Sequence, residues 1–67
     1  MPSSVIESFH YNPESRTLRV NFLSGTIYDY YQVPEWIFVK MNSYKSKGTF
    51  LNRFIKGNFD YSRVDPS

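Results

Sequence analysis

The chain has 67 residues and a mass of 8.0 kDa, which suits one small domain and leaves no room for a second. It contains no cysteine and a single histidine, His10, which excludes disulfides, thiolate metal sites and a cysteine nucleophile. The net charge of +2 hides an asymmetry: residues 1–35 hold two arginines against four acids, whereas residues 36–67 hold six cations against two acids.

No apolar run approaches the roughly 20 residues that cross a bilayer. The start of the chain, residues 1–7, has neither the basic beginning nor the apolar centre of a signal peptide. We therefore expect a soluble cytoplasmic protein that meets no membrane. Aromatic residues make up 19% of the chain, and burying such large side chains compensates for the small core of a short domain.

Three runs of β-forming residues occupy the first half of the chain, over residues 5–11, 17–22 and 26–33. The first run has a broken alternation, and the second alternates cleanly between apolar and polar residues. The runs are separated by the turn sequences Asn12–Ser15 and Leu23–Gly25. Because both connections are short, the sequence predicts a three-stranded antiparallel meander.

The length of the second turn decides which face of the third strand is buried. A two-residue loop would place Asp29 opposite Val20 on the apolar face. A three-residue loop, closed by Gly25 in the left-handed region, pairs apolar residues with aromatic ones and a cation with an anion. We predict this second register, with Val20 opposite Tyr28, Leu18 opposite Tyr30 and Arg19 opposite Asp29. It buries Tyr28 and Tyr30, and it leaves Ile27 and Tyr31 on the open face.

The second half of the chain predicts two helices. Val33-Pro34-Glu35 is a start signal with proline at the first helical position, and Ser46 is a candidate N-cap for the second helix. Apolar residues then recur at helical spacing, and Gly57 ends the second helix. We expect an α+β domain, a three-stranded antiparallel β-meander followed by two α-helices packed on one face (β-β-β-α-α). The ordered core is predicted over about residues 4–61, with loose ends at 1–4 and 63–67.

Trp36, in the first turn of the first helix, has two open interpretations: a partly exposed anchor, or a side chain that closes the edge of the core.

The residue pattern of the chain as a whole is more informative. It consists of Ile6, Tyr11, Leu18, Val20, Phe22, Gly25, Tyr28-Asp29-Tyr30, Val33-Pro34, Ser46-Lys47-Gly48, Phe50, Asn52 and Ile55. In this order and spacing the chain resembles the KTSC domain, a family named for its occurrence at the C-terminus of some lysyl-tRNA synthetases.

The resemblance covers nearly the whole chain and implies one KTSC-like domain over residues 1–67. Family members also occur as free-standing small bacterial and phage proteins. Attachment to a tRNA-handling enzyme suggests an RNA-binding role, by association and not by mechanism. One departure is Tyr44, where the resemblance leads us to expect a small residue such as alanine.

We predict no enzyme, no catalytic residue, no metal and no cofactor. His10 lies in a predicted strand, the carboxylates are scattered, and the glycines occur singly and form no phosphate loop. Ser46 and Lys47 are adjacent helical residues, which do not face each other as a nucleophile and base would.

RNA is the predicted partner, and two surfaces offer a physical basis for it. At the start of the second helix, unpaired N–H groups with Lys45, Ser46 and Lys47 could hold a phosphate, and Arg53 and Lys56 would extend the basic track. On the open face of the sheet, a base could stack on Tyr31 beside Arg19.

Two other interpretations stay open. The cations could form a solvated helical face with no partner. Alternatively, the chain is a protein-docking module or homodimer that uses the aromatic residues of the open sheet face, for which Tyr31, Ile27 and Trp36 are the candidates. Salt separates these hypotheses, because charge-led RNA binding weakens steeply with salt and an aromatic interface does not.

Overall fold

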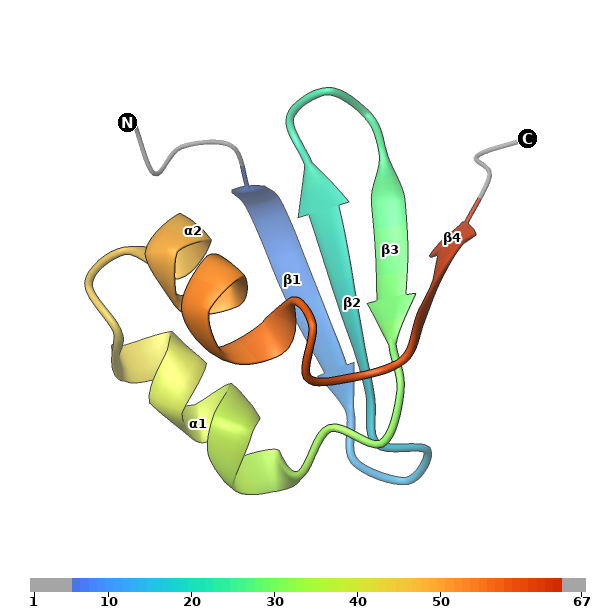
Figure 1. Cartoon of the computed structure of the whole chain (residues 1–67), viewed down its shortest axis with the longest axis vertical. Coiled ribbons are helices and arrows are strands. Elements are labelled where there is room, and N and C mark those ends of the chain that lie inside the picture. The colour runs from blue at the N-terminus through green and yellow to red at the C-terminus, as the bar shows by residue number, and fades with distance from the viewer. Residues whose placement is uncertain (1–5, 65–67) are drawn as a thin grey trace.

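The structure, a computed structural model, describes residues 6–64 as an α+β domain (Figure 1). Three strands come first, followed by two α-helical segments, a π-helical segment and a short last strand. In chain order these are β1 (Ile6–Asn12), β2 (Thr17–Phe22), β3 (Ile27–Tyr30), α1 (Glu35–Ser43), α2 (Lys47–Phe50), η1 (Leu51–Ile55) and β4 (Tyr61–Val64). The strands form one antiparallel sheet in the order β1-β2-β3-β4.

The three-residue turn between β2 and β3 is confirmed, and with it the predicted register. Gly25 has φ of +94°, and the Phe22 N–H donates to the Thr26 carbonyl oxygen at 2.9 Å. The residue pairs across β2 and β3 are Leu18–Tyr30, Arg19–Asp29 and Val20–Tyr28. Tyr30 is accordingly buried, whereas Tyr28 is half-buried, less than predicted.

The bulge in β1 explains the broken alternation of the first run. Ile6 pairs with Phe22 and Ser8 with Asn21, so Glu7 is the extra residue. The bulge brings Ile6 to the same face of the sheet as Phe9 and Tyr11. One face of β1 therefore contributes three apolar or aromatic side chains to the core.

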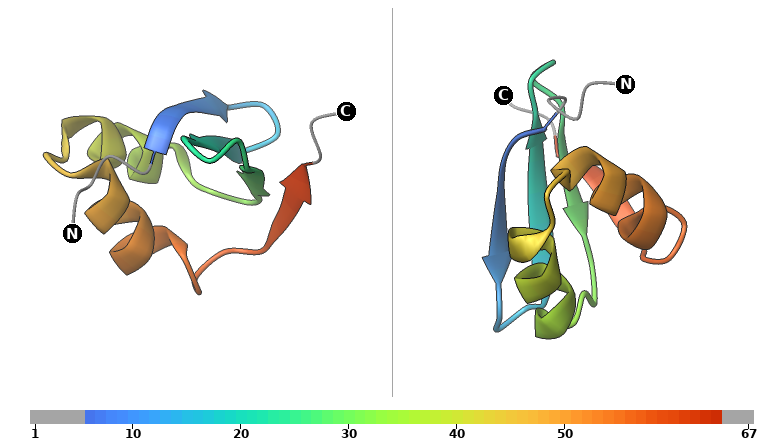
Figure 2. Two further views of the ribbon diagram at one scale, coloured as in Figure 1. Left: turned by 90° about the horizontal axis from the view of Figure 1, so that it is seen from above. Right: turned by 90° about the vertical axis from the view of Figure 1, so that its left-hand side faces the viewer.

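The helices lie on one side of the sheet, and the other side is open (Figure 2). The core between the two layers is formed by the inward face of the sheet and the apolar faces of the helices. Its buried residues are Leu18, Val20, Tyr30, Val33, Ile37, Met41, Phe50, Leu51 and Ile55. In the described range 6–64, no helix is long and apolar enough to cross a membrane.

The prediction of three strands is wrong, because Tyr61–Val64 forms a fourth strand beside β3. Arg63, predicted to lie in a loose end, pairs with Tyr28 within this strand. The missed strand is only four residues long, and it hydrogen-bonds to a partner some thirty positions earlier, which local patterning does not reveal. The predicted loose ends at residues 1–4 and 65–67 lie outside the described residues.

The second helix begins as predicted but does not continue as a regular α-helix. Ser46 is its N-cap, and its Oγ accepts from the Thr49 N–H at 3.3 Å. From Leu51 the chain forms a π-helical turn, closed by the Lys56 N–H donating to the Leu51 carbonyl at 2.8 Å. Gly57 follows with φ of +83° and reverses the chain toward β4.

The start of α1 and the link between the helices differ from expectation in detail. Pro34 is the residue before the helix, not its first residue, and Trp36 is 62% exposed, which favours the exposed interpretation of its role. Tyr44 ends α1, and its ring packs against Phe50 and Phe54, with centroids 5.2 and 6.1 Å apart. A large residue here therefore fills space between the helices.

Candidate nucleic-acid interface

A polar row crosses the open face of the sheet. The pairings place His10 beside Arg19, Arg19 beside Asp29, and Asp29 beside Ser62, one residue from each strand. The Arg19 Nε and Nη2 donate to the two carboxylate oxygens of Asp29 at 2.8 and 3.0 Å. This bidentate pair holds the guanidinium in one orientation and leaves its other N–H groups facing solvent.

Asp29 largely neutralises Arg19. The hydrogen bonds and charge of Asp29, with a smaller contribution from Tyr31, raise the pKa of Arg19 above its ordinary value. The Asp29 side chain is 13% exposed and the Arg19 side chain 48% exposed. The pair therefore presents hydrogen-bond donors more than net positive charge.

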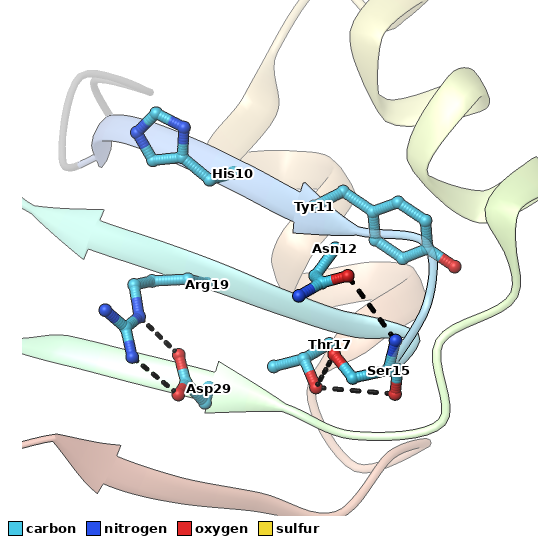
Figure 3. A pocket seen from close by; sticks show the side chains of 7 residues that line it. All are labelled: His10, Tyr11, Asn12, Ser15, Thr17, Arg19 and Asp29. Carbon is cyan, nitrogen blue, oxygen red and sulfur yellow. Dashed lines mark hydrogen bonds and ion pairs between the residues drawn. The ribbon is translucent and has the colours of Figure 1, made fainter.

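A shallow hollow of about 460 Å³ lies beside this pair (Figure 3). The turn between β1 and β2 shapes one end of it, because the Asn12 side chain accepts from the Glu14 and Ser15 N–H groups. The Ser15 hydroxyl donates to Thr17 Oγ1 at 3.0 Å. The lining residues are His10, Tyr11, Asn12, Ser15, Thr17, Arg19 and Asp29. His10 is exposed, as expected of a strand residue on the open face.

Tyr31 lies on the same open face as Arg19, as predicted, and is 38% exposed. Its hydroxyl is hydrogen-bonded to Ser62 Oγ, and its N–H donates to the Asp60 carbonyl at 2.8 Å. The missed strand β4 thus holds Tyr31 in place. The structure brings Arg19 and Tyr31 to one surface, where the ring of Tyr31 is partly accessible.

At the start of α2, the first of the two predicted RNA-binding surfaces, Ser46 and Lys47 make hydrogen bonds within the protein. The Ser46 hydroxyl is bonded within the cap, and Lys47 is half-buried. The Lys47 Nζ donates to the carbonyls of Asn42, at 3.1 Å, and Tyr44. Those carbonyls end α1 and lack helical partners, so the ammonium satisfies them. The Lys47 ammonium is therefore engaged at the end of α1, and a phosphate contact by Lys47 stays a prediction.

The other predicted cations of the helical layer are exposed. Lys45 precedes α2, Arg53 lies in η1, and Lys56 follows η1. Lys40, in the last turn of α1, is also exposed, and its Nζ lies 5.6 Å from the centroid of the Phe54 ring. No acidic residue occurs between Trp36 and Phe59. The helical layer therefore carries four exposed cations, together with the acidic Glu35 in the first turn of α1.

Tyr61 and Arg63 are exposed surface residues that sequence analysis did not select. In β4 they lie on the helix side of the sheet, opposite Tyr30 and Tyr28 respectively. The sequence signal for these residues was the short alternation Tyr61-Ser62-Arg63-Val64. This alternation identifies a strand only when its pairing with β3 is known. Among residues 6–64, no group of three metal-ligating side chains comes together.

Comparison with known proteins identifies the family. The KTSC domain model matches residues 2–59. Lysine–tRNA ligases of Nostoc sp. and Nostoc punctiforme are each 38% identical over 61 residues, which is 91% of this chain. The chain spans only 11% of the length of those ligases. A protein of Stutzerimonas stutzeri is 33% identical over 66 residues, covering 97% of this chain and 93% of its own length.

The fold has a solved counterpart. The crystal structure of a KTSC domain protein from Yersinia pestis superposes with a TM-score of 0.90 at 35% identity. The match covers 97% of this chain and 92% of that one. Sequence and structure agree, and the chain belongs to the KTSC domain family.

Proposed function

We propose that this domain is a non-enzymatic RNA-binding module whose helical layer contacts phosphates. The observation that carries the proposal is the set of four exposed cations on that layer with no acidic residue between Trp36 and Phe59: Lys40, Lys45, Arg53 and Lys56. Lysine and arginine contacts to phosphates release counterions, so such binding is salt-sensitive and tolerant of sequence. The similarity to part of enzymes named lysine–tRNA ligases supports RNA as the polyanion.

The helical layer is the better candidate of the two surfaces. Arg19 is neutralised by Asp29 on the open face, and the Tyr31 hydroxyl is already bonded to Ser62. The open face therefore attracts a polyanion weakly, although the free N–H groups of Arg19 remain able to donate to a base or phosphate. We assign the main contacts to the cations of the helical layer and a secondary role to Arg19 and Tyr31.

The experiment is a titration of fluorescently tagged single-stranded and hairpin RNA at several salt concentrations. Replacing Lys45 and Arg53 together by Gln removes two phosphate contacts. For single-stranded RNA each contact contributes about 0.7 to the slope of log affinity against log salt, so the slope should fall in magnitude by about 1.4. The folded fraction should not change, because both side chains are exposed.

A matched control removes an exposed cation from the sheet layer. Arg16 lies in the turn between β1 and β2, so Arg16→Gln should leave RNA affinity nearly unchanged, whereas Arg53→Gln alone should weaken it. Equal losses in the two variants would contradict a role for the helical layer. No binding by the wild-type protein at about 100 μM, weaker than ordinary non-specific binding, would exclude the RNA proposal.

One observation favours protein docking as a second candidate. Trp36 and Val39 are 62% and 57% exposed, and their spacing places them on one face of α1. The exposed apolar surface of this candidate thus lies on α1 instead of the open sheet face. A salt-insensitive partner whose binding is lost in Trp36→Ala, together with no RNA binding, would favour docking.

A further inference from the structure

A tyrosine pocket lies on the helix side of the sheet, between β3, β4 and the end of η1. It has a volume of about 420 Å³ and is lined by Tyr28, Tyr30, Lys56, Gly57 and Tyr61. The helices lie toward β1 and β2, and the chain after η1 crosses to β4 at the opposite edge (Figure 1). The helix-side face of β3 and β4 is therefore only partly covered, and the pocket occupies this uncovered end.

Three tyrosine rings form the aromatic wall of the tyrosine pocket. The Tyr61 centroid lies 5.5 Å from that of Tyr28 and 5.6 Å from that of Tyr30, with interplanar angles of 78° and 39°. Tyr30 is almost fully buried, whereas Tyr61 is 60% exposed. The Tyr61 ring is therefore open to a flat ligand from solvent, and it also contacts the rings of Tyr28 and Tyr30. This arrangement suits the stacking of a planar aromatic group.

The charges around the tyrosine pocket favour an anion. Lys56 is exposed and lines the pocket, and Arg63 is exposed and lies opposite Tyr28 on the same face of the sheet. Within residues 6–64, no acidic residue lines the pocket: Asp29 pairs with Arg19 on the opposite face, and Asp60 lines a neighbouring hollow beside Tyr31 that shares Gly57 and Tyr61 with the pocket. A ligand that combines an aromatic ring with negative charge matches both features.

We propose that the tyrosine pocket binds one unpaired nucleotide of an RNA chain. The base stacks on Tyr61, and the adjoining phosphates lie against Lys56 and Arg63. The pocket volume falls within the range of about 300–1,000 Å³ that is usual for small-molecule sites, enough for one nucleotide. This inference rests on the proposed function and deepens it, because Lys56 also belongs to the cations of the helical layer. It gives a role to the Tyr28-x-Tyr30 motif, whose two rings share one face.

The test compares single-stranded RNA with a duplex of the same sequence. The duplex reaches the helical cations but offers no unpaired base. Tyr61→Leu should weaken single-stranded binding by about tenfold, within the range measured for base–aromatic stacking, and should leave duplex binding within about twofold. Tyr61→Phe keeps the ring and should bind both RNAs like the wild type.

Two further controls make the outcome decisive. Tyr31→Ala removes a tyrosine from the opposite face and should change single-stranded binding much less than Tyr61→Leu. Gly57 lines the tyrosine pocket, and its amide signal should shift in NMR spectra on addition of the single strand. If wild-type protein binds RNA but Tyr61→Leu binds the single strand equally well, the pocket assignment is overturned while the proposed function stands. If the wild type binds neither RNA, both are overturned.

Discussion

Replacing Lys47 by Met tests whether this lysine caps α1 or contacts RNA. Methionine keeps most of the apolar stem and removes the ammonium that donates to the Asn42 and Tyr44 carbonyls. Hydrogen bonds from charged groups contribute about 1.5–3 kcal/mol each when enclosed. Because Lys47 is only half-buried, we expect the two together to contribute about 2 kcal/mol, a large part of the stability of so small a domain.

The assay is urea unfolding followed by circular dichroism. With a denaturant slope of about 1 kcal/mol per molar urea, the midpoint of Lys47→Met should fall by about 2 M. Lys45→Met is the matched control, since Lys45 is exposed, and its unfolding free energy should change by less than about 0.5 kcal/mol. RNA affinity, measured under conditions where both variants are folded, should fall in Lys45→Met and persist in Lys47→Met. Equal stability of the two variants, or a larger loss of affinity in Lys47→Met, would refute the capping role.

The remaining predictions concern Tyr30 and Ser46. Tyr30→Ala should cost about 3–5 kcal/mol, because it empties a buried aromatic site, and urea midpoints will measure it; a cost below 1 kcal/mol would contradict the burial. Burial raises the pKa of Tyr30 above its ordinary value of 10.0, so the unfolded chain loses this proton at lower pH than the folded one. The unfolding free energy should therefore fall as pH rises above about 10. Tyr30→Phe should show a smaller fall between pH 9 and pH 11, and equal falls in the two proteins would contradict this prediction. Ser46→Ala should lower the unfolding free energy by about 1 kcal/mol through loss of the cap, whereas Ser43→Ala, at an exposed site, should cost less.

The local pattern of the chain was sufficient to predict the β-meander and its register. Alternation in β2 defines two faces, and the three-residue turn ending at Gly25 leaves one pairing that joins Arg19 to Asp29 without burying a carboxylate among apolar residues. The Ser46 cap was equally predictable, because its hydroxyl bonds only three residues ahead. These features depend on residues that are close in sequence or that face each other across a short turn. They can therefore be predicted from one short stretch of the chain.

The candidate sites depended on contacts that local pattern does not encode. Lys45 and Lys47 look alike in the sequence, yet the fold turns one toward solvent and aims the other at the end of α1. Whether a lysine is free to bind phosphate depends on which backbone carbonyls lie near its ammonium. The reversal of the chain between the two helices sets the positions of those carbonyls. No propensity or spacing carries that information.

The fourth strand is another feature that depends on long-range contacts. Tyr61–Val64 is too short to be recognised alone, and it becomes a strand because β3 offers it an unpaired edge. That pairing holds Tyr31 on one face and brings Tyr61 to Tyr28 and Tyr30 on the other. The sequence by itself determined the β-meander, the helix cap and the positive charge of the second half. Only the tertiary structure decided which cations are free and where the tyrosines meet, because both follow from long-range pairing of backbone groups.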